Sequence, residues 1–241
     1  MPGKTLKTEA VVLRSIRYAE ADRILHLYSA RYGRIGAIAK GARRPRSRFG
    51  GRLEPFFRLD LLLHEGRGEL LTVTGVSTVD GYPRLRSSGP GLTAAARACD
   101  AVLRLLDSTE PNLPAYNLLC RYLGMLDDPA AEGAAGLETA LSFRLKLALA
   151  AGFAPELASC ARCGEAEHLT GFSGAAGGVV CSGCEAGSFA LSEEGHRFMV
   201  EAIARPLAEA PPAEAAALRQ AERAVTETLE HHAHVQLRPA A

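Results

Sequence analysis

The sequence predicts a multi-domain α+β protein, with an OB-fold β-barrel at the amino end followed by an α-helical domain with an inserted four-cysteine zinc finger. Three observations support this fold class. Apolar residues alternate with polar ones over the first part of the chain, helical spacing takes over after a break rich in glycine and proline, and two C-x-x-C pairs lie in a glycine-rich segment. Alternation with period two is typical of strands, and spacing of three to four residues is typical of helices.

Five apolar runs of strand length lie in the amino-terminal part, at residues 11–13, 24–28, 35–39, 57–63 and 71–74. In the third run Ile35, Ala37 and Ala39 form one alternating set, as expected for a sheet with one buried face. Five short strands in so short a segment fit a small closed barrel. The OB-fold is the natural candidate, although strand count alone leaves an SH3-like barrel open.

Helical patterns begin after residues 81–91, where glycine and proline interrupt the chain. The leucines at positions 137, 141, 145 and 149 repeat every four residues, and a last helix is expected at residues 212–232. Ser192 is a candidate N-cap that precedes two glutamates. We therefore expect an OB-fold nucleic-acid-binding barrel at 1–82 and an α-helical domain at 83–241, with a zinc-binding segment at 157–188.

The formal net charge of +1 hides a division between two oppositely charged parts. Residues 1–58 hold 14 Lys/Arg and 4 Asp/Glu, a net of +10, and the remainder holds 14 and 23, a net of −9. Such a division predicts a polyanion-binding module at the amino end. The alternative is a solvated basic face without a ligand.

The positive charge is densest at residues 40–48, which hold five Lys/Arg and no acid. Pro45 and the flanking glycines predict a mobile loop, and arginines on such loops neutralise phosphates. Tyr28 and Phe57 are expected in the barrel core, whereas Tyr32 and Phe49 are open to either role. The predicted DNA contacts are Arg14, Arg17, Arg34, Lys40, Arg43, Arg44, Arg46 and Arg48, with Arg31 as a further member of this surface.

The cysteines Cys160, Cys163, Cys181 and Cys184 form the pattern C-x2-C-x17-C-x2-C. Two such knuckles supply four thiolates, which matches tetrahedral Zn²⁺, and the spacing is that of a zinc ribbon. A site with four sulfur ligands has no open position, so the zinc is expected to be structural. The competing redox interpretation needs a βαβ setting that this segment lacks. The remaining cysteines, Cys99 and Cys120, are expected in the core.

Catalytic and membrane functions find no support in the sequence. No set of nucleophile, base and orienting group is visible, so we expect no enzymatic activity. No apolar run approaches the roughly 20 residues that span a bilayer, and no signal-peptide core follows the amino terminus. A cytoplasmic protein is expected. His231, His232 and His234 are best explained by favourable placement at a helix C-terminus.

The chain resembles the RecO family of bacterial recombination mediators in a set of segments whose order and spacing are specific together. These segments lie at residues 11–13, 20–25, 33–34, 39–44, 47–48, 53–56, 143–145, 152–155 and 160–164. The resemblance implies an OB-fold, a helical domain with a zinc finger, and a non-enzymatic role in RecF-pathway recombinational repair.

With that role, the resemblance implies that the protein binds single- and double-stranded DNA and promotes strand annealing. It also implies that the protein helps to load RecA onto gaps covered by single-stranded DNA-binding protein. RecR and RecF are implied as partners, and RecA indirectly, at the nucleoid. By position, the resemblance implies DNA contacts at Lys40 and at the arginines of residues 43–48. It implies that the four clustered cysteines are the zinc ligands. The helical domain is the implied dock for the acidic tail of single-stranded DNA-binding protein, with Arg121, Arg144 and Lys146 as candidate contacts.

Two other functions use the same residues. An RNA-binding or translation-associated OB protein with a zinc ribbon needs the same basic surface, and a zinc-dependent enzyme needs the same cysteines. The sequence leaves open the oligomeric state, the stoichiometry with RecR, the need for RecF, the contacts to the acidic tail, and which aromatic residues stack on bases.

Overall fold

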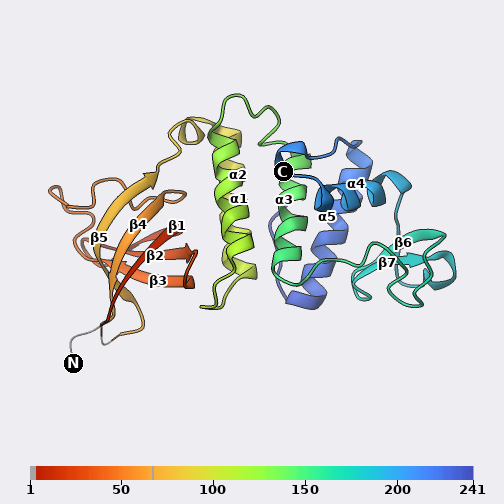
Figure 1. The fold of residues 1–241 in the computed structure, drawn as a ribbon, viewed down its shortest axis with the longest axis horizontal. Coiled ribbons are helices and arrows are strands. Elements are labelled where there is room, and N and C mark those ends of the chain that lie inside the picture. The colour runs from red at the N-terminus through yellow and green to blue at the C-terminus, as the bar shows by residue number, and fades with distance from the viewer. Residues whose placement is uncertain (1–3, 67, 241) are drawn as a thin grey trace. The chain divides into compact units, whose positions relative to one another are not determined.

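The computed structural model describes residues 4–66 and 68–240. These residues divide into two compact units, with the boundary between residues 128 and 129. The first unit contains a β-barrel and two helices, and the second contains three helices and a small sheet (Figure 1). None of the helices within the described ranges is both long and apolar enough to cross a membrane.

Five strands form a closed barrel in the first unit. They are β1 (Thr5–Tyr18), β2 (Asp22–Ser29), β3 (Gly33–Ala39), β4 (Arg58–His64) and β5 (Leu71–Asp80). Their order around the barrel is β1-β2-β3-β5-β4, and β1 pairs with β4 to close it. Only the β3–β5 pair is parallel among these described strands. This OB-like barrel, with the helices and cysteine cluster that follow, confirms the predicted fold class.

Alternating side chains fill the interior of the barrel, because successive residues of a strand point to opposite faces. Leu25 and Leu27 of β2, and Leu59, Leu61 and Leu63 of β4, are almost fully buried. Two residues of the long β3–β4 connection, Phe49 and Leu53, complete this core with exposures of 1% and 2%. The connection therefore takes part in the hydrophobic core that stabilises the barrel.

A helical hairpin follows the barrel within the same unit. It consists of the 3-10 turn η1 (Leu85–Ser87), α1 (Gly89–Leu105) and α2 (Leu113–Asp127). The side chains of Ser88 and Asn112 accept N-capping hydrogen bonds, and a proline occupies the first turn of each helix. Since these helices share the compact unit of the barrel, the predicted domain boundary after residue 82 stays a prediction.

In the second unit three helices pack against one another, and α5 also contacts the small sheet that carries the cysteine cluster. The helices are α3 (Leu137–Ala150), α4 (Glu193–Ala204) and α5 (Ala215–Thr228), with η3 (Leu207–Glu209) and a π-helical turn η4 (Leu229–Ala233). The sheet has the order β7-β6-β8, with β6 (Leu169–Ser173), β7 (Gly178–Cys181) and β8 (Phe189–Ala190), and η2 (Ser182–Cys184) follows β7. Ser192 caps α4 by accepting a 3.1 Å hydrogen bond from the Gly195 amide, as predicted.

Arg144 of α3 corrects one expectation from the sequence. We expected it on a surface pocket for an acidic tail, but its side chain is buried, with 4% of the residue exposed. Its guanidinium lies 3.5 Å from the Glu222 carboxylate of α5 and donates to the Arg238 carbonyl. A buried arginine needs such partners, because an uncompensated buried charge is costly. Arg144 therefore holds the carboxyl-terminal segment against α3 and α5.

Candidate nucleic-acid interface and metal centre

The basic stretch at residues 40–48, which we name the basic turns, is a succession of tight turns. Backbone hydrogen bonds run from Arg44 to Gly41 (3.1 Å), from Ser47 to Arg44 (2.9 Å) and from Gly50 to Ser47 (3.3 Å). The glycine at position 41 has a φ of +68°, which residues with a side chain adopt at a cost. Glycine and proline thus give the segment its turns, as the sequence suggested, but the predicted mobile loop has a regular set of internal bonds.

Contacts with Ala21 and with Asp22, the first residue of β2, hold the basic turns in place. The Asp22 carboxylate accepts a 2.8 Å hydrogen bond from the Gly41 amide, and the Arg43 amide donates to the Ala21 carbonyl at 2.8 Å. Beyond the turns, Arg23 and Glu54 form an ion pair at 2.6 Å. The backbone that presents the arginines is therefore fixed, which lowers the entropy lost when they bind a ligand.

The charged ends of the basic turns face solvent. Lys40, Arg43, Arg44, Arg46 and Arg48 are all exposed, and none of them pairs with a carboxylate within residues 4–66 and 68–240. Arg48 lies over the Phe49 ring at 4.9 Å and reaches the Val73 carbonyl at 3.4 Å. The turns therefore present a concentrated positive charge that is available to an anion.

The predicted arginines on the strands divide between two faces. Arg14 of β1 is paired in register with His26 of β2, and the charges of Arg14 and Arg34 reach that histidine. Burial lowers the pKa of His26, and these two arginines lower it further. Arg17 is an odd number of residues from Arg14 and so lies on the opposite face of β1. Arg34 is half-buried and donates to the Leu103 carbonyl at 3.5 Å.

The aromatic residues of the barrel are mostly structural. Tyr28 and Phe49 are 1% exposed, which confirms the prediction for Tyr28 and places Phe49 in the core. Tyr32 and Phe57 are half-buried and pack against the core, so Phe57 lies at its edge and not within it as expected. Tyr18, at the end of β1, is different because half of its surface is exposed.

The four clustered cysteines converge as predicted. Their sulfur atoms all lie within 4.8 Å of one another, and those of Cys163 and Cys181 are 3.7 Å apart. Cys160 and Cys181 are buried, Cys184 is half-buried and Cys163 is exposed. Four sulfurs at these separations match the donor set and geometry that structural Zn²⁺ prefers, so the residues fit the metal.

The four cysteines differ in how readily they ionise. Burial opposes ionisation of Cys160, but backbone hydrogen bonds at Cys181, Arg162 and Cys163 outweigh it and lower its pKa to about 6. Contacts with the thiols of Cys163 and Cys181 raise the pKa of Cys184 to about 12. Because crowded thiolates repel one another, a bound cation is the natural way to ionise all four.

Arg162, which lies within the first knuckle, bridges it to the second. Its guanidinium donates to the carbonyls of Cys184 at 2.7 Å and Ala186 at 2.8 Å, and it reaches the Ser173 hydroxyl at 3.4 Å. Sequence reasoning missed this role, since an arginine between two cysteines is equally compatible with a solvated side chain. It acts as a positioning residue that sets the separation of the knuckles.

Close contacts join the segment that carries the cysteine cluster to α5. A side chain at Gly174 would lie 2.4 Å from the Glu227 Cβ, and the Gly174 carbonyl lies 2.9 Å from the His232 imidazole. His232 therefore has a contact of its own beyond its position near a helix end. Of the remaining cysteines Cys99 is buried as predicted, whereas Cys120 is only half-buried.

The chain is thus an α+β protein in which an OB-like barrel precedes a helical part with a cysteine cluster that can hold a metal ion. The family model described as "Recombination protein O N terminal" matches residues 1–82, and that described as "Recombination protein O C terminal" matches residues 86–239. The chain belongs to the RecO family.

Relatives similar to this chain bear the name DNA repair protein RecO. The protein from Rubrobacter xylanophilus is 41% identical over 210 residues, which cover 85% of this chain and 83% of that protein. The protein from Anaeromyxobacter dehalogenans is 36% identical over 244 residues, which cover 94% and 91%. The protein from a Nocardioides species is 37% identical over 237 residues, which cover 94% and 93%.

Proposed function

We propose that this protein is a non-enzymatic DNA-binding protein of RecF-pathway recombinational repair. It binds single- and double-stranded DNA, promotes strand annealing, and helps load RecA onto gaps covered by single-stranded DNA-binding protein. The observation that carries the proposal is the set of exposed arginines on the basic turns, none of which forms an ion pair with a carboxylate in the part of the chain that the structure describes. The names of the relatives, which refer to DNA repair, support the same assignment.

The basic turns bind sugar-phosphate backbones electrostatically and without reading sequence. Lys40 and the arginines at positions 43, 44, 46 and 48 are the main contacts, and Arg14 and Arg34 extend the surface along the strands. Arg17 contributes from the opposite face of β1. Positive charge that lies near two strands at once lowers their mutual repulsion, which favours annealing.

Zinc has a structural role in this proposal. Cys160, Cys163, Cys181 and Cys184 hold the ion through four thiolates, and no position is left for water or substrate. The metal stabilises a ribbon segment whose own core is small, and Arg162 keeps the knuckles together.

The partners in this proposal follow from the family. RecR, RecF and single-stranded DNA-binding protein are direct partners, RecA is an indirect one, and the protein acts at the nucleoid in the cytoplasm. The barrel at 1–82 binds DNA, and the helical part at 83–241 serves the protein contacts. Since Arg144 is buried among Glu222 and the carboxyl-terminal segment, the acidic tail docks elsewhere on the helical part, where Arg121 is exposed.

A charge-reversal experiment tests the proposal. Arg43, Arg44, Arg46 and Arg48 are changed together to Glu, and DNA affinity is measured by fluorescence anisotropy with single strands and duplexes. The matched control reverses four exposed arginines outside the barrel, Arg84, Arg121, Arg197 and Arg219, so that the net charge is the same. We expect loss of affinity for every DNA sequence in the first variant only. Equal loss in both variants rejects a specific role of the basic turns, and preference for matched RNA strands favours an RNA-binding function instead.

A further inference from the structure

The members of the cysteine cluster differ in their access to solvent. Cys163 is exposed, whereas Cys160 and Cys181 are buried. The backbone beside Cys163 is open as well, because a side chain added at Gly164 would meet no atom of the described chain within 4 Å. A small molecule in solution therefore reaches Cys163 before it reaches the two buried cysteines.

A second sulfur atom lies within reach of Cys163. The sulfur atoms of Cys163 and Cys181, which belong to different knuckles, are 3.7 Å apart. A disulfide needs a separation of about 2.05 Å, so these atoms must approach by roughly 1.7 Å. Cys163 lies in a turn outside the strands, where such a shift disturbs no strand pairing. An accessible cysteine beside a second one is the arrangement of redox-sensing sites.

We infer that the cysteine cluster is a peroxide-sensitive site, at which oxidation joins Cys163 to Cys181 and ends metal binding. The inference rests on the structural zinc of the proposed function and goes beyond it, because it adds a chemical modification of two ligands. The disulfide connects the two knuckles. It therefore differs from the disulfide of a redox-active C-x-x-C pair, which forms within one pair.

The oxidation proceeds in two steps. The Cys163 thiolate attacks one oxygen of hydrogen peroxide, the O–O bond breaks, and hydroxide leaves as a sulfenic acid forms on Cys163. The Cys181 thiolate then attacks the sulfenic sulfur, the S–O bond breaks, and a second hydroxide leaves as the disulfide forms. Two electrons thus pass from the two sulfurs to one peroxide molecule, which takes up two protons and ends as two waters.

The loss of two ligands should empty the metal site. A disulfide between Cys163 and Cys181 leaves only Cys160 and Cys184 as thiolates, whereas structural zinc needs four ligands. The small core of this segment includes Cys160 and Cys181 themselves, so loss of the metal should loosen it. The same segment contacts α5 through Gly174. Peroxide should therefore lower the stability of the second unit.

Release of zinc tests the inference in the full-length protein loaded with Zn²⁺. Hydrogen peroxide is added in the presence of a chromophoric chelator, and peptide mass spectrometry locates each oxidised cysteine. We expect loss of the bound zinc together with a disulfide between Cys163 and Cys181. A reductant and fresh Zn²⁺ should restore both the metal and the melting temperature.

Two controls separate the cluster from the other thiols of the chain. The double variant Cys99→Ala/Cys120→Ala removes the cysteines outside the cluster and should release zinc as the wild type does. Peptide mapping of the wild type gives the same information if that variant is unstable. Brief treatment of the zinc-loaded protein with iodoacetamide should label Cys163 before Cys160, because the reagent reaches the exposed cysteine first.

The outcomes separate this inference from the zinc assignment. Zinc release that accompanies the Cys163–Cys181 disulfide supports the inference. Retention of zinc in peroxide, a disulfide between any other pair, or labelling of Cys160 first overturns it while the structural zinc site stands. Full-length protein that takes up no zinc overturns the zinc site of the proposed function itself.

Discussion

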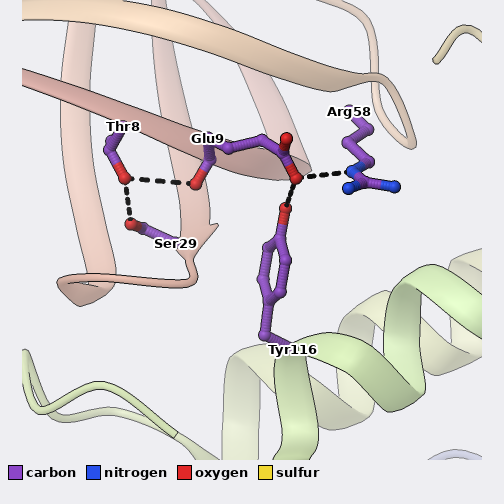
Figure 2. A network of polar contacts seen from close by, with 5 residues as sticks. All are labelled: Thr8, Glu9, Ser29, Arg58 and Tyr116. Atoms are coloured by element: carbon purple, nitrogen blue, oxygen red, sulfur yellow. Dashed lines mark hydrogen bonds and ion pairs between the residues drawn. The ribbon is translucent and has the colours of Figure 1, made fainter. Parts of the chain in front are cut away.

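The Tyr116 hydroxyl of α2 donates a 2.6 Å hydrogen bond to the Glu9 carboxylate of β1 (Figure 2). The Arg58 guanidinium of β4 donates to the same carboxylate oxygen, also at 2.6 Å. One carboxylate thus joins two neighbouring strands of the barrel to the helical hairpin. A third contact nearby, between the hydroxyls of Thr8 and Ser29 at 2.7 Å, is buried.

Loss of the Tyr116 hydroxyl should destabilise the barrel–hairpin contact. Hydrogen bonds to charged groups contribute about 1.5–3 kcal/mol, and partial exposure of Glu9 reduces that value, so Tyr116→Phe should cost about 1–2 kcal/mol. Urea unfolding of the full chain measures the change. Tyr32→Phe, elsewhere on the barrel, is the control, and a similar loss in both variants contradicts a special role of the Glu9 contact.

The same contact should make stability depend on pH. Burial raises the pKa of Glu9, but the hydrogen bonds from Tyr116 and Arg58 and the charge of Arg58 together bring it below the ordinary 4.5. A carboxyl group whose pKa is lower in the folded state than in the unfolded state stabilises the fold at pH values above its unfolded-state pKa. This stability is lost as the pH falls through the folded-state pKa. The stability difference between wild type and Glu9→Gln should therefore be full above pH 4.5 and shrink below it. A difference independent of pH in urea titrations is the contrary result.

Gly33 at the start of β3 should not tolerate a side chain. Its φ is +55°, and an added Cβ would lie 2.3 Å from the Glu110 carbonyl and 2.9 Å from that of Ser108, in the α1–α2 connection. We expect Gly33→Ala to lower the free energy of unfolding by about 1–3 kcal/mol through strain and displacement of this connection. Gly51→Ala, at an exposed glycine with no atom near the added Cβ, is the control. Equal thermal stability of the two variants speaks against this close approach.

Arg162 should govern retention of the metal. Residues that orient metal ligands from outside the coordination shell typically contribute 10- to 100-fold in affinity, so Arg162→Ala should weaken zinc binding by about that factor. Competition with a chromophoric chelator measures the affinity, and Arg219→Ala serves as an exposed control. Chelation of the metal should also lower the melting temperature of the second unit. Zinc affinity equal to that of the wild type means that the two knuckles hold their separation without the arginine.

The sequence predicted the barrel and the cysteine cluster well because both depend on local patterns. Period-two alternation identifies strands, and two C-x-x-C pairs position four sulfurs over short distances. The spacing of Arg14 and Arg17 is a local signal of the same kind. They are an odd number of residues apart, so they lie on opposite faces of a strand.

The remaining features depend on contacts between distant residues. The basic turns are fixed by Asp22 and by burial of Phe49, and neither contact has a local pattern. Arg144 looked like a surface charge because its partner, Glu222, lies on another helix. The cavity lined by Tyr18, Ile24 and Ile38 likewise forms only where the β4–β5 connection meets β3, which no local spacing indicates.

The salt dependence of DNA binding tests most directly whether the basic turns bind phosphates. The affinity of the wild type and of a variant with Arg43, Arg44, Arg46 and Arg48 changed to Gln is measured for one single strand over a range of salt concentrations. Each lost phosphate contact should reduce the slope of log affinity against log salt by about 0.7, so the variant should be shallower by roughly 3. Parallel slopes for the two proteins would contradict the account, because the arginines would then contact no phosphate.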